Sequence, residues 1–150
     1  MELSKQAFKD SDDVFFFQTL IKSSSDWRDE EGNPSNVRLY MDKYQDGDWL
    51  VWYKNKARVA ITYHVEHAPS NNRPWIGTVL VSPSERRLGI GKKVVEQLRG
   101  ELSERGHKAV YAAVPVERNQ WIQFLASCGF EQFKLEKEND KMYLVFVLPS

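Results

Sequence analysis

Residues 79–92 read VLVSPSERRLGIGK, and this stretch decides the fold. Its apolar start predicts the end of a strand, Ser82-Pro83 predicts a turn, and the two glycines come just before an amphipathic helix. The first backbone N–H groups of a helix have no partner inside the helix and carry partial positive charge, so they bind phosphate groups. Glycine lets the backbone approach such an anion without a side chain in the way. The stretch therefore predicts a phosphate-binding loop.

The spacing of the glycines separates three kinds of phosphate loop. A P-loop requires Gly-x-x-x-x-Gly-Lys-Ser/Thr, but here Lys93 follows Gly91-Lys92, and no glycine stands five residues before Gly91. A dinucleotide-binding loop requires a third glycine, where this chain has Val94. Residues 86–91, Arg-Arg-Leu-Gly-Ile-Gly, fit a third pattern, Q/R-x-x-G-x-G/A.

That third pattern resembles the loop of the GNAT acetyltransferases. The resemblance runs from about Trp75 to Phe130 and includes the apolar strand before the loop and the later Cys128-Gly129-Phe130. It implies one α/β domain over residues 1–150, with a mixed, mostly antiparallel sheet flanked by about four helices. It also implies an N-acetyltransferase that moves an acetyl group from acetyl-CoA to a primary amine. Direct attack in a ternary complex is expected, because the chain offers no credible nucleophile for a covalent intermediate.

The resemblance implies roles for individual residues. Backbone groups of the strand should pair with the pantetheine arm of CoA, and the amides from 87 to 92 should hold its pyrophosphate. The residues implied in CoA binding are Val79, Leu80, Val81, Arg86, Arg87, Leu88, Gly89, Ile90, Gly91, Lys92 and Asn119. Two positions depart from the family pattern: Leu125 stands where a tyrosine usually protonates the leaving thiolate, and Asn119 lies one residue nearer Gly129 than the pattern has it. A CoA-binding module without turnover and an unrelated phosphate-binding protein are the alternatives.

Two residues could accept the proton of the amine. A strand expected from Ala57 to about Glu66 carries His64 and Glu66 on one face, because they are two residues apart. Either could act as the general base, and Glu66 is preferred because a carboxylate also helps to bind an ammonium group. The bland alternative is that both are solvated residues at a strand end.

Metal and cysteine chemistry are not expected. His64-Val65-Glu66 fits the H-x-E of zinc deaminases, but that family also needs Pro-Cys-x-x-Cys, and Cys128 is the single cysteine. Cys128 lies on an apolar helix face, which is typical of a core position. His67 would complete a metal-binding set with His64 and Glu66, yet the expectation is no metal.

The acceptor amine, a small molecule or a peptide, is not identified by the sequence. Residues 26–35 are polar and include Gly32 and Pro34, so they are expected to form a loop. Asp26, Asp29, Glu30 and Glu31 make it acidic, which suits either a solvated loop or attraction of a cationic amine.

The remaining elements follow from hydrophobic periodicity and from caps. A helix is expected from about Val14 with Asp10 or Ser11 as its N-cap, and a short helix with Ser35 as its cap. Strands are expected at 49–53, 75–81, 110–114 and 142–148, with a hairpin turn at 54–56 and with 142–148 as an interior strand. Helices are expected at 91–105, stopped by Gly106, and around 121–128.

Composition limits the class of protein. The 150 residues carry 21 basic and 21 acidic side chains, which argues against nucleic acid as the main partner. No apolar stretch approaches the ~20 residues of a membrane helix. A single cysteine suits a reducing compartment, so a cytoplasmic protein is expected. The oligomeric state stays open, a homodimer included.

Overall fold

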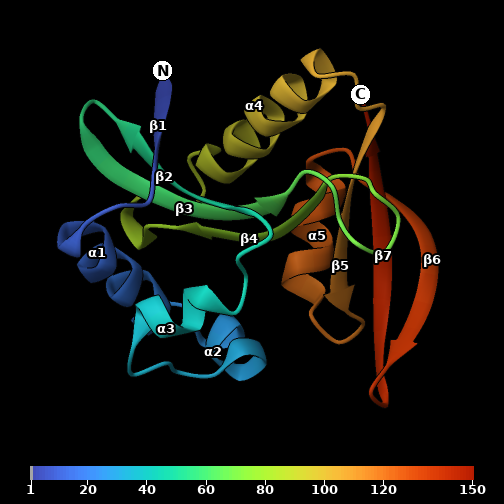
Figure 1. Cartoon of the computed structure of the whole chain (residues 1–150), viewed down its shortest axis with the longest axis horizontal. Helices are drawn as coiled ribbons and strands as arrows, with labels where there is room; N and C mark the ends of the chain where they lie inside the picture. The colour runs from blue at the N-terminus through green and yellow to red at the C-terminus, as the bar shows by residue number, and fades with distance from the viewer. Residues whose placement is uncertain (1) are drawn as a thin grey trace. The chain divides into compact units, whose positions relative to one another are not determined.

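The computed structural model describes residues 2–150 and has an α/β fold with seven strands and five α-helices in that range (Figure 1). In chain order the elements are β1 (Leu3–Ala7), α1 (Ser11–Lys22), α2 (Ser25–Glu31), α3 (Val37–Asp42), β2 (Asp48–Lys54), β3 (Ala57–Val65), β4 (Trp75–Val81), the 3-10 turn η1 (Pro83–Glu85), α4 (Ile90–Glu104), β5 (Ala109–Pro115), α5 (Asn119–Ser127), β6 (Glu131–Glu138) and β7 (Lys141–Pro149). The strand order is β1-β2-β3-β4-β5-β7-β6, with β4 and β5 parallel. The pairs β1–β2, β2–β3, β5–β7 and β6–β7 are antiparallel, which confirms the expected mixed sheet.

The chain divides into two compact units. The first unit runs up to His64 and includes Thr78–Gly91, whereas the second consists of Val65–Gly77 and Lys92–Ser150. The glycine loop thus belongs to the first unit, and most of α4 belongs to the second.

Helix α1 begins where its sequence predicts. Asp10 is the N-cap and forms a capping box with Asp13: the Asp10 side chain accepts from the amide of Asp13, and the Asp13 side chain accepts from the amide of Asp10. The helix buries Phe17, Leu20 and Ile21. Asp13 is also buried, and its Oδ1 accepts a hydrogen bond of 2.9 Å from Nε of Arg58 on β3. The positive charge of Arg58 compensates the negative charge of the buried Asp13 carboxylate.

Two expectations for the N-terminal half need correction, and one strand was missed. Residues 26–31 are helical (α2), because Trp27 is buried against Phe17 and Tyr40 and because Arg28 bonds the carbonyls of Ile21 and Lys22. The N-cap of α3 is Asn36 and not Ser35, since its side chain accepts from the amide of Leu39. Strand β1 had not been expected.

Strands β2 and β3 form the predicted hairpin. The turn residues Asn55 and Lys56 have φ of 51° and 68°, a left-handed pair that suits a tight hairpin. Residues 59–64 of β3 are all buried, so both faces of this strand are covered.

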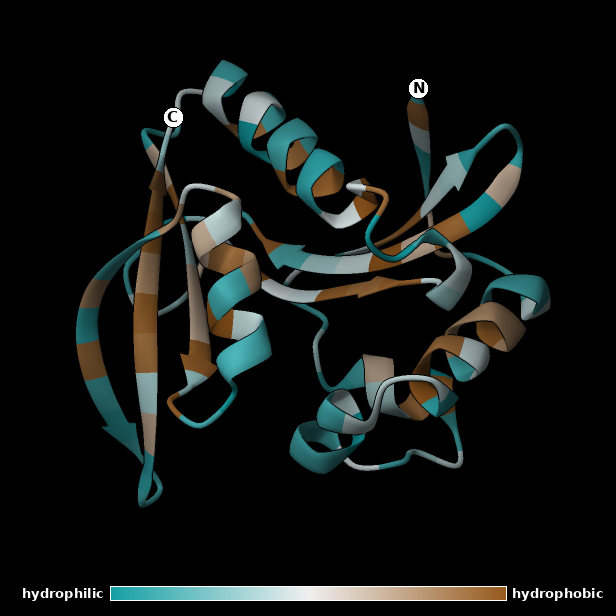
Figure 2. Ribbon diagram, turned by 180° about the vertical axis from the view of Figure 1, so that it is seen from behind, coloured by the Kyte–Doolittle hydropathy of each residue, from teal (hydrophilic) through white to brown (hydrophobic). Residues whose placement is uncertain are grey.

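In the second unit, β7 is the interior strand that its apolar sequence predicts. Figure 2 shows β7 as hydrophobic along most of its length, whereas its neighbour β6 is largely hydrophilic and is exposed at every position. The turn after α5 lies close to β7, because a Cβ on Gly129 would stand 3.3 Å from Leu148 Cδ1. The predicted end of α4 is confirmed at Gly106, whose φ is +95°.

None of the helices in the described part of the chain has the length and apolar character that a membrane crossing requires.

Candidate functional site

The glycine loop has an unusual backbone that leaves one side of it open. After η1, Arg87 has φ of 67° and Gly89 has φ of 80°, and α4 begins at Ile90. A Cβ placed on Gly89 would have no other atom within 4 Å. Space therefore lies next to the Gly89 backbone, and the positive φ favours glycine there.

The start of α4 is suited to an anion. Its first turn, which lies wholly among residues 2–150, carries no acidic side chain, and the side chains of Lys92 and Lys93 are exposed. Arg87 is exposed as well, and Leu88 is 54% exposed. Ile90 is buried and anchors the helix start in the core. The amides that begin a helix generally lack partners inside the helix, so together with helix polarity and the nearby cations they suit a phosphate group.

Arg86 holds the loop in place from within the first unit. Its Nε donates to the carbonyl of Val81 at 3.1 Å. Its Nη2 donates to Ser23 Oγ at 3.2 Å and to Ser24 Oγ at 3.1 Å. One residue earlier, Glu85 pairs with Lys54 of β2 at 2.8 Å. The guanidinium of Arg86 is thus engaged by protein oxygens, which suits a residue that positions the loop.

The strand before the loop supplies backbone groups. Leu80 is buried, whereas Val79 and Val81 are half-buried. At the end of β4 the amide of Ser82 donates to the carbonyl of Val59 on β3 at 2.8 Å. The backbone of 79–81 is therefore fixed on the side of β3.

His64 lies near the end of β3, where it faces Asp48 of β2. The two residues are paired in the strand register, and His64 Nε2 is 3.8 Å from Asp48 Oδ2. The histidine is buried. Gly47 is required beside it, because a Cβ there would overlap the carbonyl of His64 and the ring of Tyr63.

Aromatic side chains and carboxylates gather in the same unit. The rings of Trp49 and Tyr63 are 4.7 Å apart, and those of Tyr44 and Tyr63 are 5.7 Å apart. Glu31 accepts hydrogen bonds from Tyr40 (2.5 Å) and Tyr44 (3.2 Å). Burial and then the charge of Asp46 raise the pKa of Tyr63, while burial and then Glu31 raise the pKa of Tyr44. Both phenols stay neutral and can donate hydrogen bonds.

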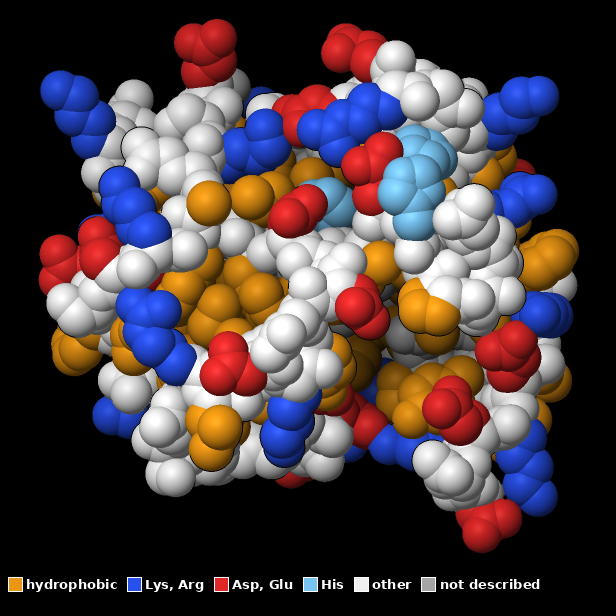
Figure 3. All heavy atoms as spheres, in the orientation of Figure 1, with side chains coloured by type: hydrophobic (Ala, Val, Ile, Leu, Met, Phe, Trp, Pro, Cys, Tyr) orange, Lys and Arg blue, Asp and Glu red, His pale blue; other side chains and the backbone are white. Residues whose placement is uncertain are grey.

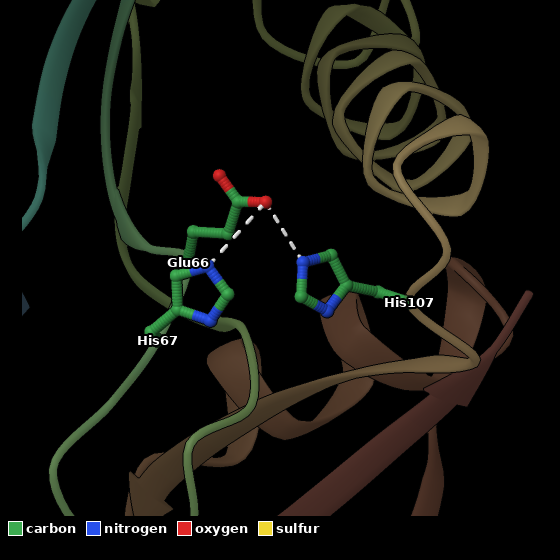
Figure 4. A group of neighbouring side chains, drawn as sticks. All are labelled: Glu66, His67 and His107. Atoms are coloured by element: carbon green, nitrogen blue, oxygen red, sulfur yellow. Dashed lines mark hydrogen bonds and ion pairs between the residues drawn. The ribbon is translucent and has the colours of Figure 1, made fainter.

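Glu66 lies just beyond the end of β3, in the second unit, and its carboxylate is bonded by Arg105 and His107. Its Oε1 accepts from Arg105 and its Oε2 from His107, each at 2.8 Å. His67 Nε2 is 3.8 Å from the same Oε2 (Figure 4). The hydrogen bond from His107 and the Arg105 guanidinium lower the pKa of Glu66 against the effect of burial. Nothing in the sequence linked His107 to Glu66, because they are 41 positions apart and no motif joins them.

The residues in and next to α5 that the family pattern singles out differ in their burial. Leu125 is buried, and its aliphatic side chain has no proton to donate. Asn119 is the first residue of α5 and is exposed. Cys128 is buried, and burial raises the pKa of its thiol, so the reactive thiolate is disfavoured at neutral pH.

Comparisons with known proteins identify relatives of this chain in sequence and in fold. The family model of the acetyltransferase (GNAT) family matches residues 14–130. An uncharacterised protein of Bacillus subtilis (strain 168), YkzC, is 42% identical over 135 residues, which is 88% of this chain and 94% of YkzC.

Solved structures share the fold at low sequence identity. A Bacillus subtilis acetyltransferase in complex with CoA has a TM-score of 0.71 at 13% identity, with 99% of each chain covered. A spermidine N-acetyltransferase SpeG chimera from Vibrio cholerae and hSSAT has a TM-score of 0.74 at 14% identity, with 99% of this chain and 96% of that chain covered. With the family model matched over most of the chain, this protein belongs to the GNAT family of acetyltransferases.

Proposed function

We propose that this enzyme transfers the acetyl group of acetyl-CoA to a cationic primary amine. The observation that carries the proposal is the loop of residues 86–92, which combines an open backbone at Gly89 with the N-terminus of a 15-residue helix. The CoA complex of the Bacillus subtilis acetyltransferase, which has the same fold, supports CoA as the ligand.

The two parts of CoA would use two consecutive stretches of the chain. The pyrophosphate would lie on the amides from 87 to 92, with charge supplied by Arg87 and Lys92. The pantetheine arm would run along the backbone of Val79–Val81 as an added strand does. One of those amides would stabilise the oxyanion that forms during transfer. The contact of Asn119 with CoA stays a prediction.

A cationic acceptor is supported by charge and by aromatic faces. Residues 26–48 carry seven acidic and three basic side chains, a local charge of −4 in a chain of zero net charge. Glu31, Asp46 and Asp48 lie on this segment together with Tyr44, and Trp49 follows it directly. Aromatic faces and carboxylates both attract ammonium groups. The spermidine N-acetyltransferase neighbour acts on such a substrate.

The reaction needs one proton acceptor and no covalent enzyme intermediate. The proton acceptor first takes one proton from the ammonium group, and the neutral amine nitrogen attacks the thioester carbon. A C–N bond forms and the C–S bond breaks, and the second nitrogen proton passes to the CoA thiolate directly or through water. A thiol with a pKa near 8.5 leaves as thiolate or takes a proton from water, so the missing tyrosine does not prevent turnover. His64 is proposed as the proton acceptor, because both oxygens of Glu66 are engaged by Arg105 and His107. Glu66 as the base stays a prediction.

The proposal is tested by release of free CoA from acetyl-CoA with a panel of amines. Turnover should be found with polyamines or other cationic amines and should be absent with anionic ones. Calorimetry with CoA, ATP and NAD should give binding for CoA alone. CoA binding without turnover on any amine would show that the protein is a CoA-binding module and not an enzyme. Binding of ATP or NAD in place of CoA would contradict the assignment of the loop to CoA.

A further inference from the structure

We propose that the second unit contains a binding site for a divalent transition-metal ion such as Zn²⁺, formed by Glu66, His67 and His107. The three ligand atoms, one carboxylate oxygen and two imidazole nitrogens, all lie within 4.8 Å of one another. Figure 4 shows both rings directed to the same oxygen of Glu66. This proposal departs from the sequence-based expectation of no metal.

The ligand atoms can reach coordination distances through side-chain rotation alone. Glu66 Oε2 is 2.8 Å from His107 Nε2 and 3.8 Å from His67 Nε2. Bonds of about 2.0–2.2 Å to a tetrahedral zinc place ligand atoms roughly 3.3–3.5 Å apart. Side-chain rotations that move the ligand atoms by up to about 1.5 Å would bring the three into this range, since none of their separations exceeds 4.8 Å. The two ring nitrogens and one carboxylate oxygen suit zinc and its transition-metal neighbours better than Mg²⁺ or Ca²⁺.

The backbone around the three ligands is well fixed. Glu66 and His67 are consecutive residues after β3, and His107 follows the glycine that ends α4. The amide of His107 donates to the carbonyl of Leu102 at 3.1 Å, and the amide of Gly106 donates to Ser103 at 3.0 Å, which is a Schellman-type ending. The backbone of His107 is therefore fixed by the helix ending, and Glu66 and His67 follow directly on β3.

Two further features suit a cation at this place. The carbonyl end of the 15-residue helix α4 carries partial negative charge, and His107 stands three residues beyond the end of that helix. Arg105 bonds the other oxygen, Oε1, of Glu66 at 2.8 Å and so orients the carboxylate with Oε2 toward the histidines. Outer contacts of this kind commonly fix the ligands of metal sites.

The site is open to solvent and has room for an exchangeable ligand. The exposed fractions of the side chains are 60% for His67, 25% for Glu66 and 15% for His107. Histidine side chains reach the surface among acidic and basic side chains on the face drawn in Figure 3. Three protein ligands leave the fourth position of a tetrahedral ion to water or to a small molecule.

The test is calorimetric titration of tag-free protein with Zn²⁺, together with the visible absorption of bound Co²⁺. We expect one ion per chain, and no binding of Mg²⁺ at the same concentrations. His67→Gln and His107→Gln should each weaken Zn²⁺ by more than about 100-fold, because even outer contacts of metal ligands cost 10–100-fold. His67 is mostly exposed, so its variant should fold normally.

His64→Gln is the matched control, because it removes the remaining histidine of the chain and leaves the three ligands in place. It should bind Zn²⁺ as the wild type does. Absence of saturable binding in the wild type would overturn the proposal, as would equal affinities for wild type and His67→Gln. All readouts are of binding, so the outcome does not depend on acetyl transfer.

Discussion

Arg86 and Ser24 are joined across 62 positions of sequence by a hydrogen bond of 3.1 Å from the guanidinium to the serine hydroxyl. With the contacts to Ser23 and Val81, this bond fixes the start of the glycine loop against the end of α1. The loop that is proposed to bind CoA is thus shaped by an arginine whose nitrogens bond to protein oxygens.

Arg86→Lys should therefore weaken acetyl-CoA binding by about tenfold although the charge is kept. Lysine cannot present the planar set of donors that Val81, Ser23 and Ser24 require. Arg87→Lys is the matched control: Arg87 is exposed and should act through its charge, so calorimetry should give nearly the wild-type affinity. The reverse ranking of the two variants would contradict the positioning role of Arg86.

The Asp13–Arg58 pair predicts a specific loss of stability in acid. Burial alone would raise the pKa of Asp13, but hydrogen bonds from the amide of Lys9 and from Arg58 lower it below its ordinary value. A lowered pKa in the folded state means that the stabilisation is present above the unfolded pKa of about 4 and is lost as the pH falls through the folded value.

Asp13→Asn should lower the free energy of unfolding at pH 7 by about 2–3 kcal/mol, since a buried charged hydrogen-bond partner is lost. The difference from wild type should shrink as the pH falls below about 4. Urea unfolding across pH measures this, with Asp12→Asn, an exposed residue of the same helix, as the control. A difference that does not depend on pH would contradict the charged state of Asp13.

The proton acceptor is tested with His64→Gln and Glu66→Gln in buffer that contains EDTA. Loss of a general base lowers turnover by about 10²–10⁴-fold while CoA affinity stays unchanged. We expect this loss in His64→Gln and a smaller one in Glu66→Gln. A full loss in Glu66→Gln alone would restore Glu66 as the base. Full turnover in both would assign proton removal to bulk water.

The acidic character of α2 predicts long-range attraction of the acceptor. Neutralising Asp26, Asp29, Glu30 and Glu31 should raise KM for a cationic amine, flatten its dependence on salt and leave kcat nearly unchanged. Exposed charges act over about 8–10 Å at physiological salt, so the effect should be largest at low salt.

The control for this variant neutralises four exposed acids of the second unit, Glu117, Glu131, Glu136 and Glu138, and keeps the same change in net charge. Its KM should match the wild type. Equal kinetics for all three proteins at low salt, or an anionic best substrate, would show that α2 has no part in attracting the acceptor.

Much of the fold is predictable from local sequence. The glycine loop, the hairpin at Asn55-Lys56 and the end of α4 depend on residues that are neighbours in the chain, so pattern and turn chemistry suffice. Helix α2 could not be predicted in this way. Its composition is polar, and it is stabilised by the burial of Trp27 among aromatic residues from other elements.

The functional residues likewise include some that local sequence identifies and some that only the fold brings together. The phosphate loop is one continuous segment, and its sequence pattern identifies it. The group of Glu66, His67 and His107 depends on the fold, because a histidine after α4 meets a carboxylate after β3. A strand pattern that placed Glu66 beside His64 could not reveal that Glu66 lies beyond the end of β3.

The measurement that tests the account most directly is calorimetric binding of acetyl-CoA to Gly89→Glu, with Gly100→Glu as the matched control. Gly89 has φ of 80° and open space beside it, so glutamate there adds both backbone strain and negative charge at the proposed pyrophosphate site. Gly100 lies within α4, and a Cβ there also meets no atom within 4 Å. We predict that Gly100→Glu binds as the wild type does and that Gly89→Glu, folded by circular dichroism, loses at least about tenfold in affinity, or ~1.4 kcal/mol. Unchanged affinity in Gly89→Glu would contradict the assignment of this loop to CoA.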